Sequence, residues 1–292
     1  MVAFPIKGLK ISTDSNNVIT VSMTDNPNAE SSGFKYYAHS RGSSKKEKFY
    51  LGAYEGYVSD NKLRSLSGVS PIGSISKIET ARTYARNNSP ASDGNGGSGY
   101  DEIAFYPAIF VQSAYLLKYK NLNSQATVGM GIISGGKQNT GGTDDKGLNY
   151  GDTSNNDTYM KLFGMENLWG CLWNHVDGTN QNSNAEIYTA TQGFNNNSTG
   201  YTKVFTVPNT DIGYFTKVSA SSEYGFVSVE YNGSETTYWC DTQQHTKNNC
   251  TPIWGSSFFD GQGGGIFAMR FEIRHTGENI WLGNCGGRLM YL

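Results

Sequence analysis

Helical periodicity is confined to two stretches of this sequence, both within residues 76–120, and this limits the chain to a fold with few helices. The first stretch follows Ser76-Lys-Ile-Glu79, a capping box that predicts a helix running to about Asn87. The second is expected to begin near Pro107, which the first turn of a helix tolerates, and to end near Lys120. Two helices without a third after them predict an α+β fold.

The second half of the chain has the alternation and turn residues of short strands. Residues 201–207 and 224–231 are rich in β-branched and aromatic side chains, and Asn232-Gly233 predicts a hairpin turn. Residues 265–275 alternate strictly, which predicts a strand with one apolar and one polar face. The apolar face would contain Phe267, Met269, Phe271 and Ile273, and the polar face Arg270, Glu272 and Arg274.

The charge and hydropathy of the chain exclude two classes of partner. Lys and Arg number 23 against 25 Asp and Glu, and a net charge of -2 predicts no basic surface for nucleic acid. No apolar run reaches the roughly 18 residues that a membrane span needs, so we expect no membrane span. The first residues show no basic region leading into a long apolar one, and no secretory signal peptide is visible.

Two local patterns could indicate ligand chemistry, and neither is strong. Gly131-Ile-Ile-Ser-Gly-Gly-Lys137 has the spacing of a phosphate-binding loop, but Gln138 replaces the Ser or Thr and no helix is expected after it. Cys240, His245 and Cys250 could be three metal ligands, although their spacing matches no usual zinc pattern. The alternatives for these cysteines are buried thiols or a surface disulfide. We therefore expect no metal and no cofactor.

Residues 164–178 form the most specific segment, Gly-Met-Glu-Asn-Leu-Trp-Gly-Cys-Leu-Trp-Asn-His-Val-Asp-Gly. Its tryptophans would fill a core, and Glu166 and Asn167 would satisfy buried backbone at a turn. The segment resembles a signature of the C-type lectin fold found in formylglycine-generating enzymes. It is more similar still to the variable proteins of diversity-generating retroelements, a family that includes phage tropism determinants.

The C-terminal part of the chain extends this resemblance. The motifs of the family's variable region follow in order as Tyr238-Trp-Cys-Asp241, Gly255 to Gly261, Gly265-Ile-Phe267 and Gly286-Gly-Arg-Leu-Met-Tyr-Leu292. Phe258 or Phe259 occupies a slot that holds tryptophan in the family. The interval from Phe267 to Gly286 is also longer than the family pattern.

The resemblance implies a fold and a division of the chain. The expected architecture is a loop-rich C-type lectin fold of the formylglycine-generating-enzyme type, with two helices packed on small antiparallel sheets. Residues 1–45 would be a lead-in segment with a strand, and residues 46–292 the lectin-like domain. Residues 238–292 would form the variable region.

The resemblance also implies a binding protein without enzymatic activity. In the family, adenine-directed retrotransposition rewrites codons of the variable region, so the encoding genome should carry an adenine-rich template repeat beside a reverse transcriptase gene. Aromatic side chains would anchor the ligand, and polar ones would set its polarity. The predicted ligand-binding residues are Tyr238, Trp239, Asp241, His245, Phe258, Phe259, Asp260, Phe271, Ile273, Arg274, His275 and Trp281. For Trp254 and Phe267, which lie beside scaffold-like glycines, we expect core positions instead.

The partner implied is a cell-surface protein or glycan, bound from a virion tail fibre or a cell surface. A homotrimer or attachment to a larger fibre would multiply weak contacts. Three other functions compete with this one. A formylglycine-generating-type oxidase needs a paired cysteine site, and only Cys285 lies in that neighbourhood. A calcium-dependent lectin needs a carboxylate where His175 stands. A structural virion protein would lack aromatic anchors on its C-terminal surface.

Overall fold

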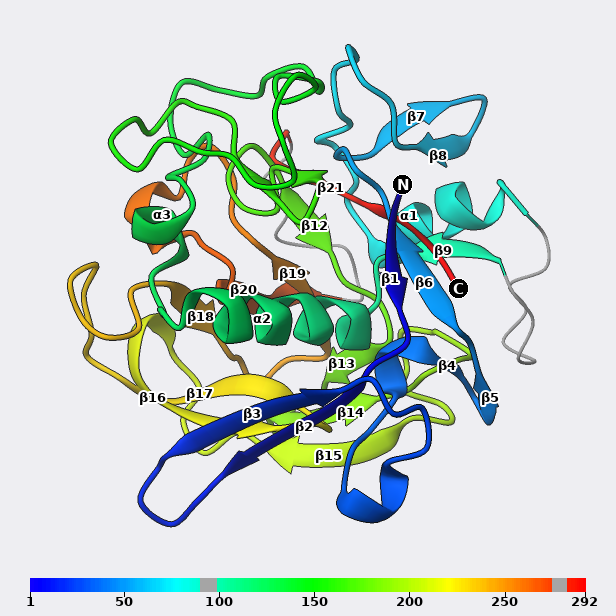
Figure 1. Ribbon diagram of the computed structural model, residues 1–292, viewed down its shortest axis with the longest axis vertical. Helices are drawn as coiled ribbons and strands as arrows, with labels where there is room; N and C mark the ends of the chain where they lie inside the picture. The colour runs from blue at the N-terminus through cyan, green and yellow to red at the C-terminus, as the bar shows by residue number, and fades with distance from the viewer. Residues whose placement is uncertain (90–98, 275–282) are drawn as a thin grey trace.

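The computed structural model describes residues 1–89, 99–274 and 283–292, and their arrangement is shown in Figure 1. These residues form an α+β fold that is mostly sheet, as the sequence predicts. Three α-helices are present in the described part, one more than expected: α1 (Ile78–Arg86), α2 (Phe105–Tyr119) and the single turn α3 (Ser124–Thr127).

The second helix matches its prediction, and the start of the first does not. In α2, Pro107 lies in the first turn, and Lys120 adopts the left-handed conformation that ends the helix. Helix α1 begins after Lys77 without a side-chain cap, so the predicted Ser76–Glu79 capping box does not form. Arg82 on the buried side of α1 pairs with Asp177 instead, and this tertiary contact positions the helix.

The largest sheet is mixed, which corrects the expectation of small antiparallel sheets. It has ten strands in the order β15-β14-β13-β19-β20-β18-β16-β17, and β12 joins β19 to β21. Most pairings are antiparallel, but β18–β20 and β12–β21 are parallel. The strands are β12 (Trp173–His175), β13 (Thr179–Gln181), β14 (Glu186–Thr189), β15 (Thr202–Thr206), β16 (Ile212–Ser221), β17 (Gly225–Tyr231), β18 (Thr242–Gln244), β19 (Cys250–Trp254), β20 (Met269–Arg274) and β21 (Cys285–Gly286).

Of two predictions about these strands, the hairpin at Asn232-Gly233 is wrong and the alternation over residues 265–275 is confirmed where the structure describes it. The predicted hairpin at Asn232-Gly233 is wrong, because β17 pairs with β16 through the turn at 222–224. After β17 the chain crosses to β18, which pairs with β16 and β20. The alternation predicted for residues 265–275 is confirmed over β20, whose apolar side chains are buried while its charged ones are half-buried. His275 lies outside the described residues.

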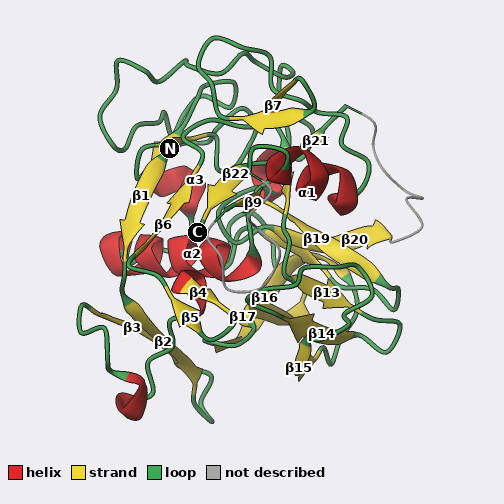
Figure 2. Ribbon diagram, turned by 90° about the vertical axis from the view of Figure 1, so that its right-hand side faces the viewer, coloured by secondary structure: helices red, strands yellow, loops and turns green. Residues whose placement is uncertain are grey.

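Both ends of the chain meet in a four-stranded sheet, visible in Figure 2. Its order is β1 (Val2–Pro5), β6 (Lys48–Leu51), β22 (Leu289–Tyr291) and β9 (Tyr100–Glu102). Four two-stranded hairpins complete the described strands: β2 (Gly8–Thr13) with β3 (Ile19–Thr24), β4 (Ser40–Arg41) with β5 (Ser44–Lys45), β7 (Tyr57–Ser59) with β8 (Lys62–Arg64), and β10 (Lys161–Leu162) with β11 (Met165–Glu166).

The main hydrophobic cluster of the described residues extends from Phe4 to Leu292. The first 45 residues contribute to it through β1 and β2, so they pack into the same core as the rest of the chain. Helix α2 supplies its centre, with buried side chains on almost every side, and crosses the middle of the molecule in Figure 1. This core supports the strands β12, β19 and β20, which form the base of the site described next.

Candidate functional site

The tryptophan-rich segment is held by a buried network of hydrogen bonds. The Glu166 carboxylate accepts from the backbone nitrogens of Gly141 and Thr143, each at 2.8 Å. The Arg288 guanidinium donates to the carbonyl oxygens of Gly52, Glu166 and Asn167 at 2.8, 2.7 and 3.0 Å. The Glu166 side chain therefore satisfies two backbone nitrogens, and Asn167 Oδ1 accepts from the Met160 backbone nitrogen at 3.4 Å, as the sequence suggested.

Two tryptophans of the scaffold are buried and hydrogen-bonded. Trp169 and Trp254 are completely buried. Their indole nitrogens donate to the carbonyl oxygens of Gly129 at 3.0 Å and Ile266 at 2.7 Å. The core position expected for Trp254 is thus confirmed, as is that of Phe267.

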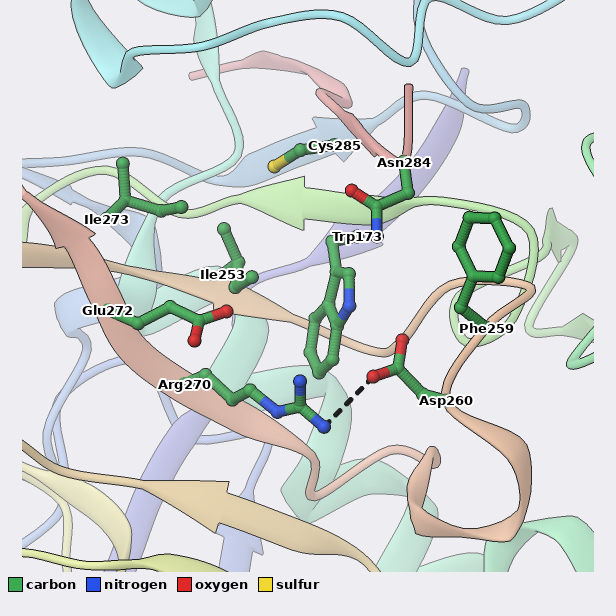
Figure 3. Close-up of a pocket in the computed structure, with 9 residues that line it drawn as sticks. All are labelled: Trp173, Ile253, Phe259, Asp260, Arg270, Glu272, Ile273, Asn284 and Cys285. Atoms are coloured by element: carbon green, nitrogen blue, oxygen red, sulfur yellow. Dashed lines mark ion pairs between the residues drawn. The ribbon is translucent and has the colours of Figure 1, made fainter. Parts of the chain in front are cut away.

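A pocket of about 350 Å³ opens beside this scaffold, shown in Figure 3. Strands β12, β19 and β20 form its base, the loop after β19 forms one side, and the start of β21 closes another. Its lining residues are Trp173, Ile253, Phe259, Asp260, Arg270, Glu272, Ile273, Asn284 and Cys285.

The Arg270 guanidinium is fixed in the pocket wall. It lies over the Trp173 ring, 4.8 Å from its centroid, and its Nη2 makes an ion pair with Asp260 Oδ1 at 2.9 Å. The other Asp260 oxygen accepts from the backbone nitrogen and hydroxyl of Ser257, at 2.9 and 2.6 Å. Asp260 therefore ties the loop after β19 to the charged face of β20.

Glu272 lies two residues further along the same face of β20 and is half-buried. Throughout the described part of the chain, no hydrogen bond or ion pair reaches its carboxylate. Burial raises the pKa of Glu272, and the nearby Asp260 carboxylate adds to this, while Arg270 lowers the pKa. The described lining of the pocket thus contains two carboxylates and one guanidinium, and of these carboxylates Asp260 is paired and Glu272 is not.

The predicted ligand-binding residues fall into four groups, which are exposed, half-buried or lining the pocket, outside the described residues, or buried away from the pocket. Tyr238 and Phe259 are highly exposed, at 88% and 74%. Phe258, Asp260 and Arg274 are half-buried, and Ile273 is buried but lines the pocket. His275 and Trp281 lie outside the described residues.

For the remaining four residues, Trp239, Asp241, His245 and Phe271, the expectation of exposed contacts is wrong. All four are buried. Trp239 packs edge-on against Phe267, and the Asp241 carboxylate accepts from the Phe267 backbone nitrogen at 2.7 Å. His245 stacks on Phe271 with ring centroids 5.0 Å apart. The cause is the position of β18 between β16 and β20, which places its flanking residues inside the sheet's packing.

The pocket also contains residues that the sequence did not single out as ligand contacts. Arg270 and Glu272 were assigned to the polar face of a strand, and this pattern was the available signal for them. Trp173 belonged to a segment interpreted as core. Asn284 and Cys285 approach the pocket only because β21 pairs with β12, a long-range contact that no local pattern indicates.

The cysteines do not form the arrangements considered from the sequence. All four are free and buried, so the suggested surface disulfide is not formed. His245 Nδ1 lies 2.8 Å from Gln181 Oε1, and the Cys250 thiol donates to the Phe271 carbonyl oxygen at 3.2 Å. Within residues 1–89, 99–274 and 283–292, no three His, Cys, Asp or Glu side chains gather as a metal-binding group.

No protein-family model matches the sequence, and the sequence matches no curated protein. Among the helices of the described residues, none has the length and apolar character that crossing a membrane requires.

Proposed function

We propose that this chain is a ligand-binding protein of the retroelement variable class, with a C-type lectin fold and a C-terminal surface that recognises a target. One observation carries the proposal: eight of the nine pocket-lining residues come from residues 253–285, within the part that the resemblance assigns to the variable region. Trp173 from the scaffold forms the remaining wall.

The buried network supports the fold part of this proposal. Arg288 of the C-terminal motif bonds to Glu166 and Asn167 of the tryptophan-rich segment, so the two motifs that carry the resemblance are adjacent in space. The α+β architecture and the long connections are compatible with a lectin-like fold. Strands β19 and β20 hold the pocket backbone in place, so exposed side chains there can change without unfolding the domain.

The exposed aromatic residues support the binding part. Phe259 extends from the pocket rim and Tyr238 precedes β18, and both offer large contact areas at low entropic cost. In this proposal the target is a cell-surface protein or glycan, and the chain acts on a virion tail fibre or a cell surface. A homotrimer would strengthen weak contacts by avidity.

The oxidase alternative receives less support. Burial raises the pKa values of the Cys171 and Cys285 thiols well above that of an ordinary cysteine. A buried, protonated thiol is a poor nucleophile, and such an oxidase needs reactive cysteines. A structural virion protein is the alternative that the following experiment separates from a binding protein.

The test is saturable binding of the fluorescently labelled chain to bacterial cells and to their extracted surface proteins and glycans. Phe259→Ala is the site variant, and Leu148→Ala is its control, because Leu148 is similarly exposed, at 70% against 74% for Phe259, and lies outside the pocket. We expect binding that Phe259→Ala weakens at least tenfold and Leu148→Ala leaves unchanged. Equal binding by both variants, or no binding to any preparation, would contradict the proposal.

A second test concerns the retroelement itself. The encoding genome should contain a near-identical repeat of the 238–292 coding region that differs at adenines, beside a reverse transcriptase gene. Absence of both would remove the basis for calling this region variable.

A further inference from the structure

We infer that the pocket binds a cationic group, a primary ammonium or a guanidinium on an apolar stem, with Glu272 as its counter-charge. This inference rests on the proposed function, since it names the ligand class of the same site. Its starting point is the charge of the pocket wall. Asp260 and Arg270 form one ion pair, so among the described lining residues the Glu272 carboxylate is the uncompensated charge.

The surroundings of Glu272 favour a cation over water as its partner. Figure 3 shows its side chain extending along the pocket beside Ile253 and Arg270. Burying a carboxylate without a partner is unfavourable, and a cation brought to it recovers that free energy. Among the described residues no hydrogen bond or ion pair joins Arg270 to Glu272: the Arg270 Nη2 pairs with Asp260, and its guanidinium lies over the Trp173 ring.

The remaining walls suit the stem of such a ligand. Ile253 and Ile273 provide apolar surface, and Phe259 stands at the other end of the pocket from Glu272 in Figure 3. A volume of about 350 Å³ lies at the lower end of the range of small-ligand pockets, roughly 300–1,000 Å³. This is room for an alkyl stem with a charged head, such as a lysine or arginine side chain of a partner protein or a free amine.

An anionic ligand does not fit the same observations. Among the described lining residues it would meet two carboxylates, Asp260 and Glu272, and one guanidinium, whose Nη2 is already paired with Asp260. The charge balance of this lining therefore favours a cation over an anion.

The experiment measures direct binding of small probes to the purified full chain by calorimetry or by ligand-detected NMR. The probes are n-butylammonium and n-butylguanidinium, with butyrate and n-butanol as anionic and neutral counterparts. We expect the cations to bind and the counterparts to bind at least tenfold more weakly. Equal or tighter binding of butyrate, or no binding of either cation, would overturn the inference.

Two variants locate the binding. Glu272→Gln removes the carboxylate with little change in shape, and Glu235→Gln removes a charge of the same kind from an exposed position outside the pocket. We expect the Kd of the cations to rise at least tenfold in the first variant and to stay unchanged in the second. A thermal melt confirms that both are folded. Equal Kd values in the two variants would show that Glu272 is not the counter-charge.

Two further comparisons separate the ligand sources and the two proposals. A short peptide with a central lysine, compared with its norleucine counterpart, distinguishes a protein side chain from a free amine. Tighter binding of the lysine peptide than of butylammonium indicates a protein partner. Loss of cell binding in Phe259→Ala without any cation binding would leave the proposed function standing and reject the inference alone. Cation binding without cell binding would support the inference and reject the proposed function.

Discussion

Arg288 Nη2 donates to the main-chain oxygen of Glu166 at 2.7 Å, across 122 residues of sequence. The contact joins the C-terminal motif to the tryptophan-rich segment inside the protein. Because its acceptor is a backbone carbonyl, it depends on the path of the chain and not on the side chain at position 166. Neighbouring surface residues can therefore change while this connection is retained.

Replacing Arg288 should destabilise the fold in proportion to the donors lost. We expect Arg288→Lys to lower the free energy of unfolding by ~2 kcal/mol and Arg288→Ala by ~4 kcal/mol, because buried carbonyls lose their donors and, in the alanine variant, the nearby Glu55 carboxyl also loses a positive charge. Denaturant unfolding measures both. Arg274→Lys is the control, since Arg274 is half-buried and makes none of these bonds. Equal effects at positions 274 and 288 would contradict the role of the network.

Glu55 should make the protein less stable as the pH rises toward neutrality. Burial raises the pKa of Glu55 from 4.5 to about 7. Between these values the unfolded chain has lost the proton that the folded protein keeps, so stability falls with rising pH, by ~3 kcal/mol at about 1.4 kcal/mol per pKa unit.

The matched variant is Glu55→Gln, which cannot ionise and retains an oxygen for the Leu172 backbone nitrogen. Thermal melts from pH 4.5 to 7.5 should show the wild type losing stability relative to this variant. Parallel pH profiles for the two proteins would refute the shifted pKa.

His245 should contribute to unfolding at acid pH. Burial lowers the pKa of His245 from 6.5 to about 3. As the pH falls below 6.5 the unfolded chain takes up a proton that the folded protein excludes, so stability decreases. His245→Asn cannot take up this proton and offers an amide nitrogen toward Gln181. Its unfolding free energy should fall less steeply than that of the wild type between pH 6.5 and 4. An unchanged slope would argue against a neutral buried His245.

Truncating Trp254 should destabilise the fold strongly, whereas truncating Phe259 should leave its stability almost unchanged. Trp254→Ala removes a buried side chain and its hydrogen bond to Ile266, and should cost ~3–5 kcal/mol. Phe259→Ser at the exposed pocket rim should change stability by no more than about 0.5 kcal/mol. Denaturant unfolding of both variants checks this. A large loss at Phe259 would mean that the rim is part of the packing.

The sequence alone determined the features that depend on neighbouring residues. Helix α2 has a proline in its first turn and ends at Lys120, and β20 alternates apolar and charged residues, so local geometry and burial specify both. The two-sided pattern of β20 also placed Arg270 and Glu272 on one face, although it did not indicate what they face.

Only the tertiary structure decided which residues reach the surface near the pocket. Trp239 and Phe271 are aromatic residues of the kind that bind ligands, and the sequence predicted this role for them. In the structure β18 lies between β16 and β20, and both side chains are buried in the protein core. Asn232-Gly233 has the composition of a hairpin turn, but β17 already pairs with β16 on its other side. Trp173 and Cys285 meet because β12 and β21 run parallel, across more than 100 residues. These outcomes depend on long-range strand pairing, whose free energy comes from burying surfaces that are distant in the chain.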